Sequence, residues 1–300
     1  MPKVAIAQTS PVLFDVERSL ERVAEWTGRA ADDGAEMVLF PEAMIAAYPK
    51  GSTFGSYLGG RTEAGRDLFR RYFESASEMP GRVTDRLAQI AREHEIAIVI
   101  GVIEREGGTL YCSVAHFRED GRYLGRRRKV MPTGTERLAW GFGDMSDHRA
   151  YDIGAGRVAS VICWENYMPM LRMATYQLSP QIYCAPTLDE RECWQASMCH
   201  IAIEGRCFVL SACQALRRRD VPDDFAGECA DLSPDTWVSR GGSCVVDPFG
   251  NYLAGPLIES EGLLCADLDL SQIERGKFDL DVTGHYARPD LFRLDVNVSR

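Results

Sequence analysis

Four residues with the chemistry of nucleophilic catalysis stand at the ends of apolar, strand-like runs of this sequence. Glu42 ends the run MVLFP, Cys163 ends ASVI, Lys129 ends the basic segment RRRK, and Glu136 lies in the following loop TGTERLAWGFGD. Taken singly, each is typical of a solvated strand end or, for the thiol, of a core position. Functional residues of α/β proteins gather where strands pass into loops, so a thiol, two carboxylates and an amine there predict a site for covalent catalysis.

Alternating strand-like and helix-like segments must position these four residues. Short apolar runs that end at turn residues predict strands, and amphipathic runs of helical period predict helices. We expect strands at 4–10, 37–42, 96–105, 157–164, 181–187, 207–213 and 262–270, hairpins within 110–129 and 242–256, and helices at 16–33, 63–78, 82–95, 167–178 and 193–206. No Pro- or Ser-rich linker divides the chain. The pattern therefore predicts one α/β domain over residues 1–300, with mixed sheets covered by helices and residues 284–300 as a tail.

Composition and charge argue against several other classes of protein. The chain has 300 residues, of which 45% are hydrophobic and 26% charged, as in an average soluble protein. Its net charge of −10 argues against a nucleic-acid partner, which requires a basic surface. No apolar run approaches the roughly 20 residues that cross a bilayer, and the N-terminus lacks a signal-peptide pattern. We therefore expect a cytoplasmic protein with no membrane partner.

The ten cysteines are expected to be reduced thiols. A long cytoplasmic chain has little use for disulfides, and none of these cysteines forms a CxxC pair. Most lie in apolar runs such as LYCSVAHF and SCVV, where cysteine behaves as a small buried hydrophobe. Metal binding is not predicted, because it would need clustered Cys and His ligands.

Three segments resemble the signature segments of the nitrilase superfamily: FPEA (40–43), RRRKVMPTGTERLAWGFGD (126–144) and CWENYMP (163–169). Three more resemble the true nitrilase branch, namely ECWQASMCHIAIEGRCFVLSACQ (192–214), TWVSRGGSCVVDPFG (236–250) and GHYARPD (284–290). The similarity runs from about Val4 to about Asp290. FPE alone is a weak signal, whereas Cys-Trp-Glu-Asn with its downstream Pro, combined with the Lys–Glu loop, is specific.

The resemblance implies a four-layer α-β-β-α sandwich with mixed sheets and a single carbon–nitrogen hydrolase domain. It implies a catalytic triad of Glu42, Lys129 and Cys163, with Glu136 supporting the lysine. It also implies that the strands before Glu42 and Cys163 end in one pocket. No metal or organic cofactor is expected.

The residue types suit the hydrolysis of a small-molecule nitrile by water. A nitrile carbon is a weak electrophile that needs a strong, soft nucleophile, and a cation beside the thiol of Cys163 favours its thiolate form. We expect Lys129 to supply that charge and Glu42 to act as general base. Attack would give a thioimidate, and water would then release ammonia and leave a thioester for hydrolysis to the acid. Lys129 and the backbone N–H after Cys163 are candidates for stabilising developing negative charge.

Two aromatic residues are candidates for substrate binding. Trp164, next to the nucleophile, is predicted to line the pocket, although core packing explains it equally well. Tyr48, in the loop after Glu42, either faces substrate or has a structural role. His200 is expected to be a buried residue of an apolar helix, and neither it nor His285 is expected to transfer protons.

The basic run RRRK has a second feature. Strand alternation would place Lys129 and Arg127 on one face, with Arg126 and Arg128 on the other. Relatives often carry His at the position of Arg127, so its role in this chain is left open.

Several alternatives remain beside the nitrilase interpretation. An amidase or N-carbamoyl hydrolase would use the same triad, although the Cys-Trp-Glu-Asn context favours nitriles, and cyanide hydrolysis is a narrower variant. A non-catalytic assembly protein is opposed by the intact triad. A homodimer or larger homo-oligomer is expected, with an interface near Cys163 and the helix that begins at Tyr167. The short segment after GHYARPD argues against long filaments, and the acidic loop 217–236 fits either a pocket rim or a subunit contact.

Overall fold

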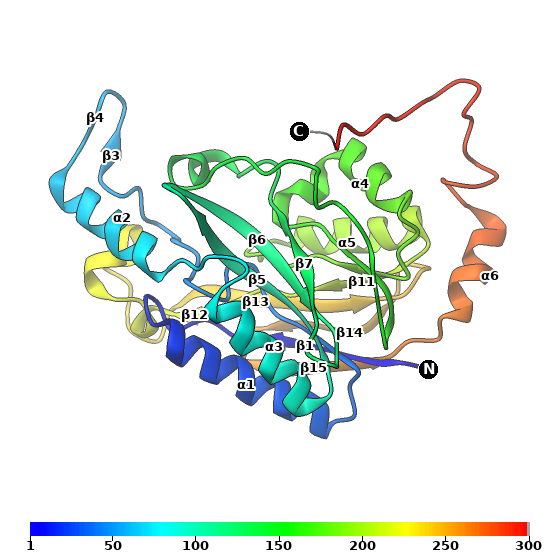
Figure 1. The fold of residues 1–300 in the computed structure, drawn as a ribbon, viewed down its shortest axis with the longest axis horizontal. Helices are drawn as coiled ribbons and strands as arrows, with labels where there is room; N and C mark the ends of the chain where they lie inside the picture. Colours follow the sequence, from blue (N-terminus) through cyan, green and yellow to red (C-terminus); the bar gives the residue numbers. More distant parts are fainter. Residues whose placement is uncertain (299–300) are drawn as a thin grey trace.

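Two mixed β-sheets pack face to face in the computed structural model, which describes residues 1–298 (Figure 1). In the first sheet, β1, β2 and β5 are parallel and the outer strands are antiparallel. Its strand order is β15 (Gly262–Asp267), β1 (Lys3–Gln8), β2 (Met37–Leu39), β5 (Ala97–Glu106), β6 (Thr109–Phe117) and β7 (Tyr123–Arg128).

The second sheet has a parallel centre formed by β9, β10 and β11. Its order is β12 (Ala215–Arg217), β13 (Trp237–Val246), β11 (Phe208–Ser211), β10 (Ile182–Cys184), β9 (Gly156–Ser160) and β8 (Tyr151–Ile153), and β14 (Tyr252–Ile258) pairs with β13. A small separate hairpin contains β3 (Ser56–Tyr57) and β4 (Gly60–Arg61). The two predicted hairpins are confirmed as β6–β7 and β13–β14.

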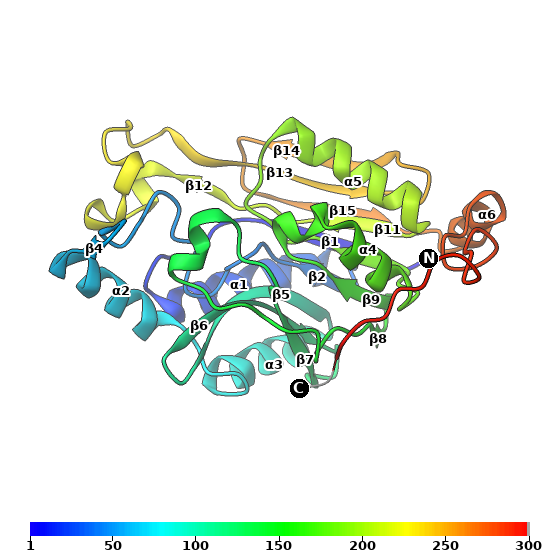
Figure 2. The same cartoon turned by 90° about the horizontal axis from the view of Figure 1, so that it is seen from above.

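Helices cover the outer faces of both sheets, which gives the four layers α-β-β-α (Figure 2). The helices α1 (Val16–Asp32) and α3 (Arg82–His94) pack on the first sheet, and α4 (Pro169–Tyr176) and α5 (Glu192–Gly205) pack on the second. The helices α2 (Glu63–Ser75) and α6 (Ser271–Asp279) lie at opposite ends of the molecule in Figure 1. The predicted fold class is confirmed.

Strand alternation divides the apolar residues between the inner and outer layers. In β5, Val99 packs in the core between the sheets, whereas Ile98 and Ile100 pack under α1 and α3. The central core takes residues such as Leu39 from the first sheet and Phe208 from the second. Because successive strand side chains point to opposite faces, a continuous apolar run can fill both layers.

A glycine in β5 lets the chain segment that carries Glu42 lie directly against the strand. A Cβ atom at Gly101 would be 2.6 Å from the Cα atom of Glu42 and closer still to the carbonyl oxygen of Pro41. Any larger residue would therefore displace this segment, since real Cβ atoms essentially never approach so closely. The requirement for glycine here comes from close backbone approach.

The structure corrects several details of the prediction. The strand expected at 157–164 ends at Ser160, and a 3₁₀ turn, Cys163–Tyr167, follows it. The helix α6 was not predicted. Helix α5 buries only one side, so His200 is exposed, contrary to expectation, and its Nε2 lies 3.5 Å from Glu204 Oε1 one turn away.

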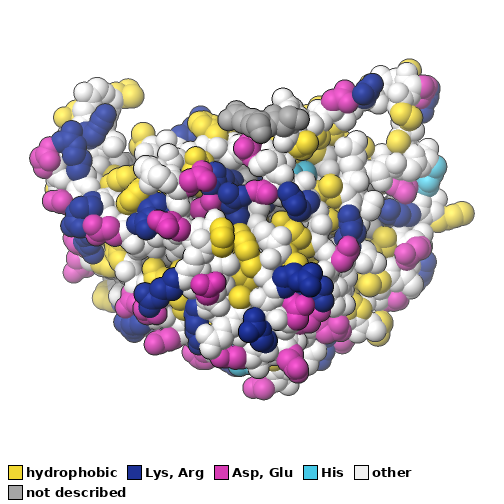
Figure 3. All heavy atoms as spheres, viewed as in Figure 1, with side chains coloured by type: hydrophobic (Ala, Val, Ile, Leu, Met, Phe, Trp, Pro, Cys, Tyr) yellow, Lys and Arg dark blue, Asp and Glu magenta, His cyan; other side chains and the backbone are white. Residues whose placement is uncertain are grey.

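Two surface features complete the fold. Figure 3 shows acidic and basic side chains interspersed across the face viewed. In the acidic loop 217–236, three short 3₁₀ turns follow β12, and Glu228 of the last turn lines the cavity that reaches Cys163. Within residues 1–298, no helix combines the length and apolar character needed to cross a membrane.

Candidate active site

Glu42, Lys129 and Glu136 form one buried ion-pair cluster. Lys129 Nζ lies 2.8 Å from Glu42 Oε1 and 2.8 Å from Glu136 Oε2. Glu42 follows β2 and Lys129 follows β7, while Glu136 lies in the 3₁₀ turn Gly134–Leu138. The lysine and both carboxylates are buried. Three of the four residues predicted from the sequence therefore meet in direct contact.

Glu136 is held from two sides. Its Oε1 accepts a hydrogen bond from the Tyr48 hydroxyl at 2.6 Å, and its Oε2 accepts one from the backbone N–H of Thr133 at 2.6 Å. The Tyr48 ring packs edge-on against Trp140, with ring centroids 5.4 Å apart. Tyr48, predicted to contact substrate, thus lies where it also orients the carboxylate that binds Lys129.

Cys163 occupies a strained turn at the end of its strand. Its φ angle is 51°, in the left-handed region that non-glycine residues adopt at some cost in energy. Its backbone N–H donates to the Pro186 carbonyl oxygen at 2.9 Å. Its sulfur accepts a hydrogen bond from the Thr187 hydroxyl at 3.2 Å. The thiol lies close enough to Glu42, Lys129 and Glu136 for their charges to act on it.

Burial and charge set the protonation states of the cluster. Burial raises the pKa of the Cys163 thiol, and the nearby Glu42 carboxylate raises it further, against the opposing effect of Lys129. Burial likewise raises the pKa of Glu42, although Lys129 opposes this. Burial alone would lower the pKa of Lys129, but Glu42 and the other nearby acidic groups raise it well above its ordinary value. The resting site therefore holds a protonated thiol and a charged lysine.

Glu42 has one oxygen available for the thiol proton. Its Oε1 binds Lys129 and also accepts a weak hydrogen bond from the Cys112 thiol at 3.4 Å. Its Oε2 is buried and has no hydrogen-bond partner among the described residues. A carboxylate with a raised pKa and a free oxygen is suited to accept a proton from Cys163.

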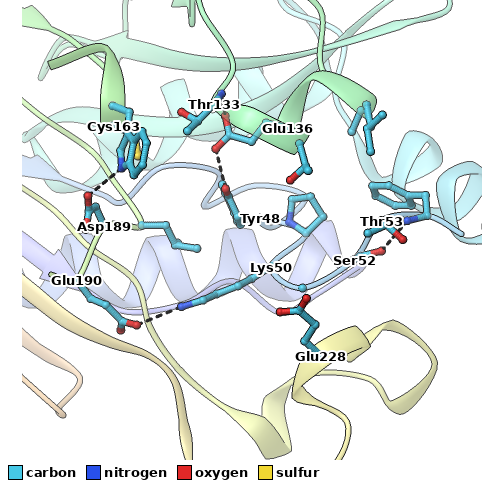
Figure 4. Close-up of a pocket in the computed structure, with 18 of the residues that line it drawn as sticks. Tyr48, Lys50, Ser52, Thr53, Thr133, Glu136, Cys163, Asp189, Glu190 and Glu228 are labelled. Atoms are coloured by element: carbon cyan, nitrogen blue, oxygen red, sulfur yellow. Dashed lines mark hydrogen bonds and ion pairs between the residues drawn. The ribbon is translucent and has the colours of Figure 1, made fainter. Parts of the chain in front are cut away.

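A cavity of about 470 Å³ reaches Cys163 and Glu136 (Figure 4). Trp164 forms part of its wall with 42% of its surface exposed, so it is not a core residue. Its indole N–H donates to Asp189 Oδ2 at 2.8 Å, and the Arg191 guanidinium lies 4.7 Å from its ring centre. The remaining lining includes Tyr48, residues 49–54, Thr133, Thr135, Leu138, Ala139, Leu188, Glu190 and Glu228.

A second buried ion pair lies beside the cluster and was missed from the sequence. Arg127 donates two hydrogen bonds to Glu165, at 2.8 and 2.9 Å. Glu165 also accepts from the backbone N–H of Val130 at 2.6 Å and of Ile162 at 3.1 Å. The pair therefore joins the residue after Lys129 to the residue before Cys163. Strand alternation predicted that Arg127 shares a face with Lys129, and both are buried, but nothing in the sequence identified the partner of Arg127.

Thr187 and Asp189 were also missed, because they become neighbours of Cys163 and Trp164 only in the folded chain. The two singled-out histidines are not part of the site, since His200 and His285 are both exposed and neither lines the cavity. In the part of the chain that the structure describes, no group of three His, Cys, Asp or Glu side chains is arranged to hold a metal ion.

Comparison with known proteins identifies the family of the chain. The model of the carbon–nitrogen hydrolase family matches residues 3–278. A bifunctional nitrilase/nitrile hydratase from Nicotiana tabacum is 50% identical over 98% of this chain and 85% of its own length. An aliphatic nitrilase from Sinorhizobium fredii is 49% identical over 98% of this chain and 95% of its own length.

Solved structures support the fold. The crystal structure of an amidase from Nesterenkonia sp. superposes with a TM-score of 0.69 at 20% identity, covering 93% of this chain and 95% of that one. At this identity the likeness concerns the fold alone. With the family model matching nearly the whole length and relatives near 50% identity, the chain belongs to the carbon–nitrogen hydrolase family.

Proposed function

We propose that the protein is a nitrilase that converts an organic nitrile and two waters into a carboxylic acid and ammonia. The observation that carries hydrolysis of a carbon–nitrogen bond is the buried Glu42–Lys129–Glu136 cluster, which lies beside Cys163 at a cavity large enough for a small molecule, and the choice of a nitrile rests on the relatives. Relatives named as nitrilases share about half of its residues over nearly the whole chain. The amidases of similar structure share only about a fifth.

The first half of the reaction forms a covalent intermediate. Glu42 accepts the Cys163 proton on its free oxygen while the sulfur attacks the nitrile carbon. The proton then passes to the nitrile nitrogen, which gives a neutral thioimidate. Lys129 stabilises the negative charge that develops on the nitrogen, together with the backbone N–H that follows Cys163.

The second half consumes two waters. Glu42 takes a proton from the first water as it adds to the thioimidate carbon and passes that proton to the nitrogen. The hydroxyl proton of the tetrahedral species then moves to the same nitrogen as the C=O bond forms and the C–N bond breaks, so ammonia leaves and a thioester remains. A second water gives a proton to Glu42 as it adds to the thioester carbon. The C–S bond then breaks to release the acid, and the departing sulfur takes the proton from Glu42, which restores the thiol. Glu136 keeps the Lys129 ammonium in position throughout, since the two are 2.8 Å apart. Trp164 and Tyr48 contact the substrate from the cavity wall.

Release of an amide is a second candidate outcome of the same intermediate. If the tetrahedral species expels the thiol instead of ammonia, one water is consumed and the amide leaves. Several similar relatives are named bifunctional nitrilase/nitrile hydratase. The amount of amide released should therefore be measured together with the acid.

The test is product release from a panel of nitriles and their matching amides, with ammonia, acid and amide each quantified. We expect wild type to release ammonia from nitriles but not from amides, and Cys163→Ala to release none. Cys193→Ala, which removes an exposed thiol of α5, is the matched control and should behave as wild type. Turnover of amides alone would replace the nitrilase proposal with an amidase. Silence on both substrate classes from folded protein would favour the assembly alternative.

We also infer a single hydrolase domain that works in the cytoplasm as a homodimer or larger homo-oligomer, with no nucleic-acid or membrane partner. Tyr167, which ends the 3₁₀ turn before α4, and Met170, in the first turn of α4, are exposed, which supports an interface on this side of the molecule. Size-exclusion chromatography that shows only monomer at micromolar concentration would refute the oligomer.

A further inference from the structure

Thr187 places a hydroxyl group against the sulfur of Cys163. It follows β10, is fully buried, and its backbone N–H donates to the Ala212 carbonyl oxygen at 2.9 Å. Its Oγ1 lies 3.2 Å from Cys163 Sγ and accepts a hydrogen bond from the backbone N–H of Asp189 at 2.9 Å. The hydroxyl is thus held between a backbone donor and the reacting atom.

We propose that Thr187 is a further catalytic residue, whose hydroxyl donates a hydrogen bond to the nucleophilic sulfur and stabilises it as a thiolate. A threonine hydroxyl has one proton and two lone pairs. The Asp189 N–H can only donate, so it occupies a lone pair and leaves the hydroxyl proton for sulfur. This assignment rests on the proposed function, in which Cys163 is the nucleophile.

The same contact determines where the thiol proton points. Because the sulfur accepts from Thr187, the S–H bond of Cys163 is directed elsewhere. The Oε2 of Glu42, a carboxylate whose charge acts on Cys163, is a buried acceptor that has no partner among the described residues. When the proton moves to Glu42, the sulfur becomes an anion facing the Thr187 hydroxyl. Hydrogen bonds to charged acceptors are stronger than those to neutral ones, so Thr187 favours the thiolate over the thiol.

Position 187 can be changed with little disturbance of shape. Valine has nearly the volume of threonine but lacks the hydroxyl, and serine keeps the hydroxyl but lacks the methyl group. Thr27 of α1 offers a matched control, because it is equally buried and its hydroxyl has no partner within the described chain. Its change to valine removes a hydroxyl from the core without touching the cavity.

The experiment measures the rate at which iodoacetamide alkylates Cys163 across pH 6–10, with the modified peptide quantified by mass spectrometry. The exposed Cys193 serves as internal reference. We expect Thr187→Val to slow alkylation at neutral pH by about 10- to 100-fold and to shift its pH midpoint upward, as expected for a lost hydrogen bond to a charged group. Nitrile turnover should fall by a similar factor. Thr187→Ser should retain most of both rates, and Thr27→Val should match wild type.

Equal rates and pH midpoints for wild type and Thr187→Val would overturn the assignment. If the valine variant does not fold, Thr187→Ser is compared with Thr187→Ala, which differ only by the hydroxyl group, and equal rates for these two would overturn it as well. Alkylation needs no substrate, so this result is independent of whether nitriles are hydrolysed. Failure of the proposed function would instead appear as folded wild type that releases no ammonia from nitriles, whatever the alkylation rates of the Thr187 variants.

Discussion

The Arg127–Glu165 ion pair connects the two sheets beside the active site, and Glu165→Gln breaks it with little change in volume. The two side chains are only 3% and 0% exposed. Glu165 accepts two hydrogen bonds from the guanidinium and one each from the backbone N–H of Val130 and Ile162. A glutamine would leave the Arg127 charge buried without a counter-charge, and its NH₂ group would face one of these donors.

The expected loss of stability follows from this geometry. Removing one partner of a buried ion pair costs about 3–5 kcal/mol, because the other charge remains desolvated. For a chain of this size, each kcal/mol lowers Tm by about 2 °C. We therefore expect Glu165→Gln to lower the free energy of unfolding by about 3–5 kcal/mol and Tm by about 6–10 °C.

Urea unfolding followed by tryptophan fluorescence and circular dichroism measures this change. Glu74→Gln is the control, since it breaks an exposed pair of α2 in which both side chains are 57% exposed. That change should cost less than about 0.5 kcal/mol. A double variant, Arg127→Met with Glu165→Gln, should recover part of the loss because no buried charge remains. A Glu165→Gln protein within about 1 kcal/mol of wild type would refute the reasoning.

Two further changes test the core and the backbone near the site. Burial lowers the pKa of His116 from 6.5 to about 3, so below pH 6.5 the unfolded chain binds a proton that the native state does not. The free energy of unfolding should therefore fall as pH drops from 6.5 toward 3. In urea unfolding, His116→Gln should reduce this fall by about 1.4 kcal/mol per pH unit. Equal slopes of unfolding free energy against pH for wild type and variant would contradict this. Gly101→Ala should displace Glu42 and lower kcat by about 100-fold. The control Gly108→Ala, at an open position, should leave kcat unchanged, and an unimpaired Gly101→Ala enzyme would count against the close approach.

Much of the architecture could be predicted from local sequence patterns. Apolar runs predicted the strands, and strand alternation predicted that Arg127 and Lys129 lie on the same face. The ends of those runs also identified Glu42 and Cys163, because a reactive side chain after an apolar strand is a local signal. Helix α5 shows the limit of this reasoning. Its composition is apolar, but only one side packs on the sheet, so His200 is exposed.

The contacts that refine the site depend on distances across the fold. Thr187 and Asp189 follow a strand that is parallel to the one before Cys163, and their proximity to that turn is a property of strand pairing. Glu165 reaches Arg127 from the opposite sheet, 38 residues along the chain. Residue types and spacing carry no information about such pairings, so these residues were not recognised in advance.

The active site is divided between the two sheets. Glu42 and Lys129 follow strands of the first sheet, whereas Cys163 and Thr187 follow strands of the second. A compact, partly unfolded state can keep its secondary structure while the packing between layers loosens. In such a molten state each sheet would survive, but the nucleophile would be separated from its base. Catalytic activity in this protein therefore depends on the packing between the two layers. It should be lost before far-ultraviolet circular dichroism detects any loss of secondary structure.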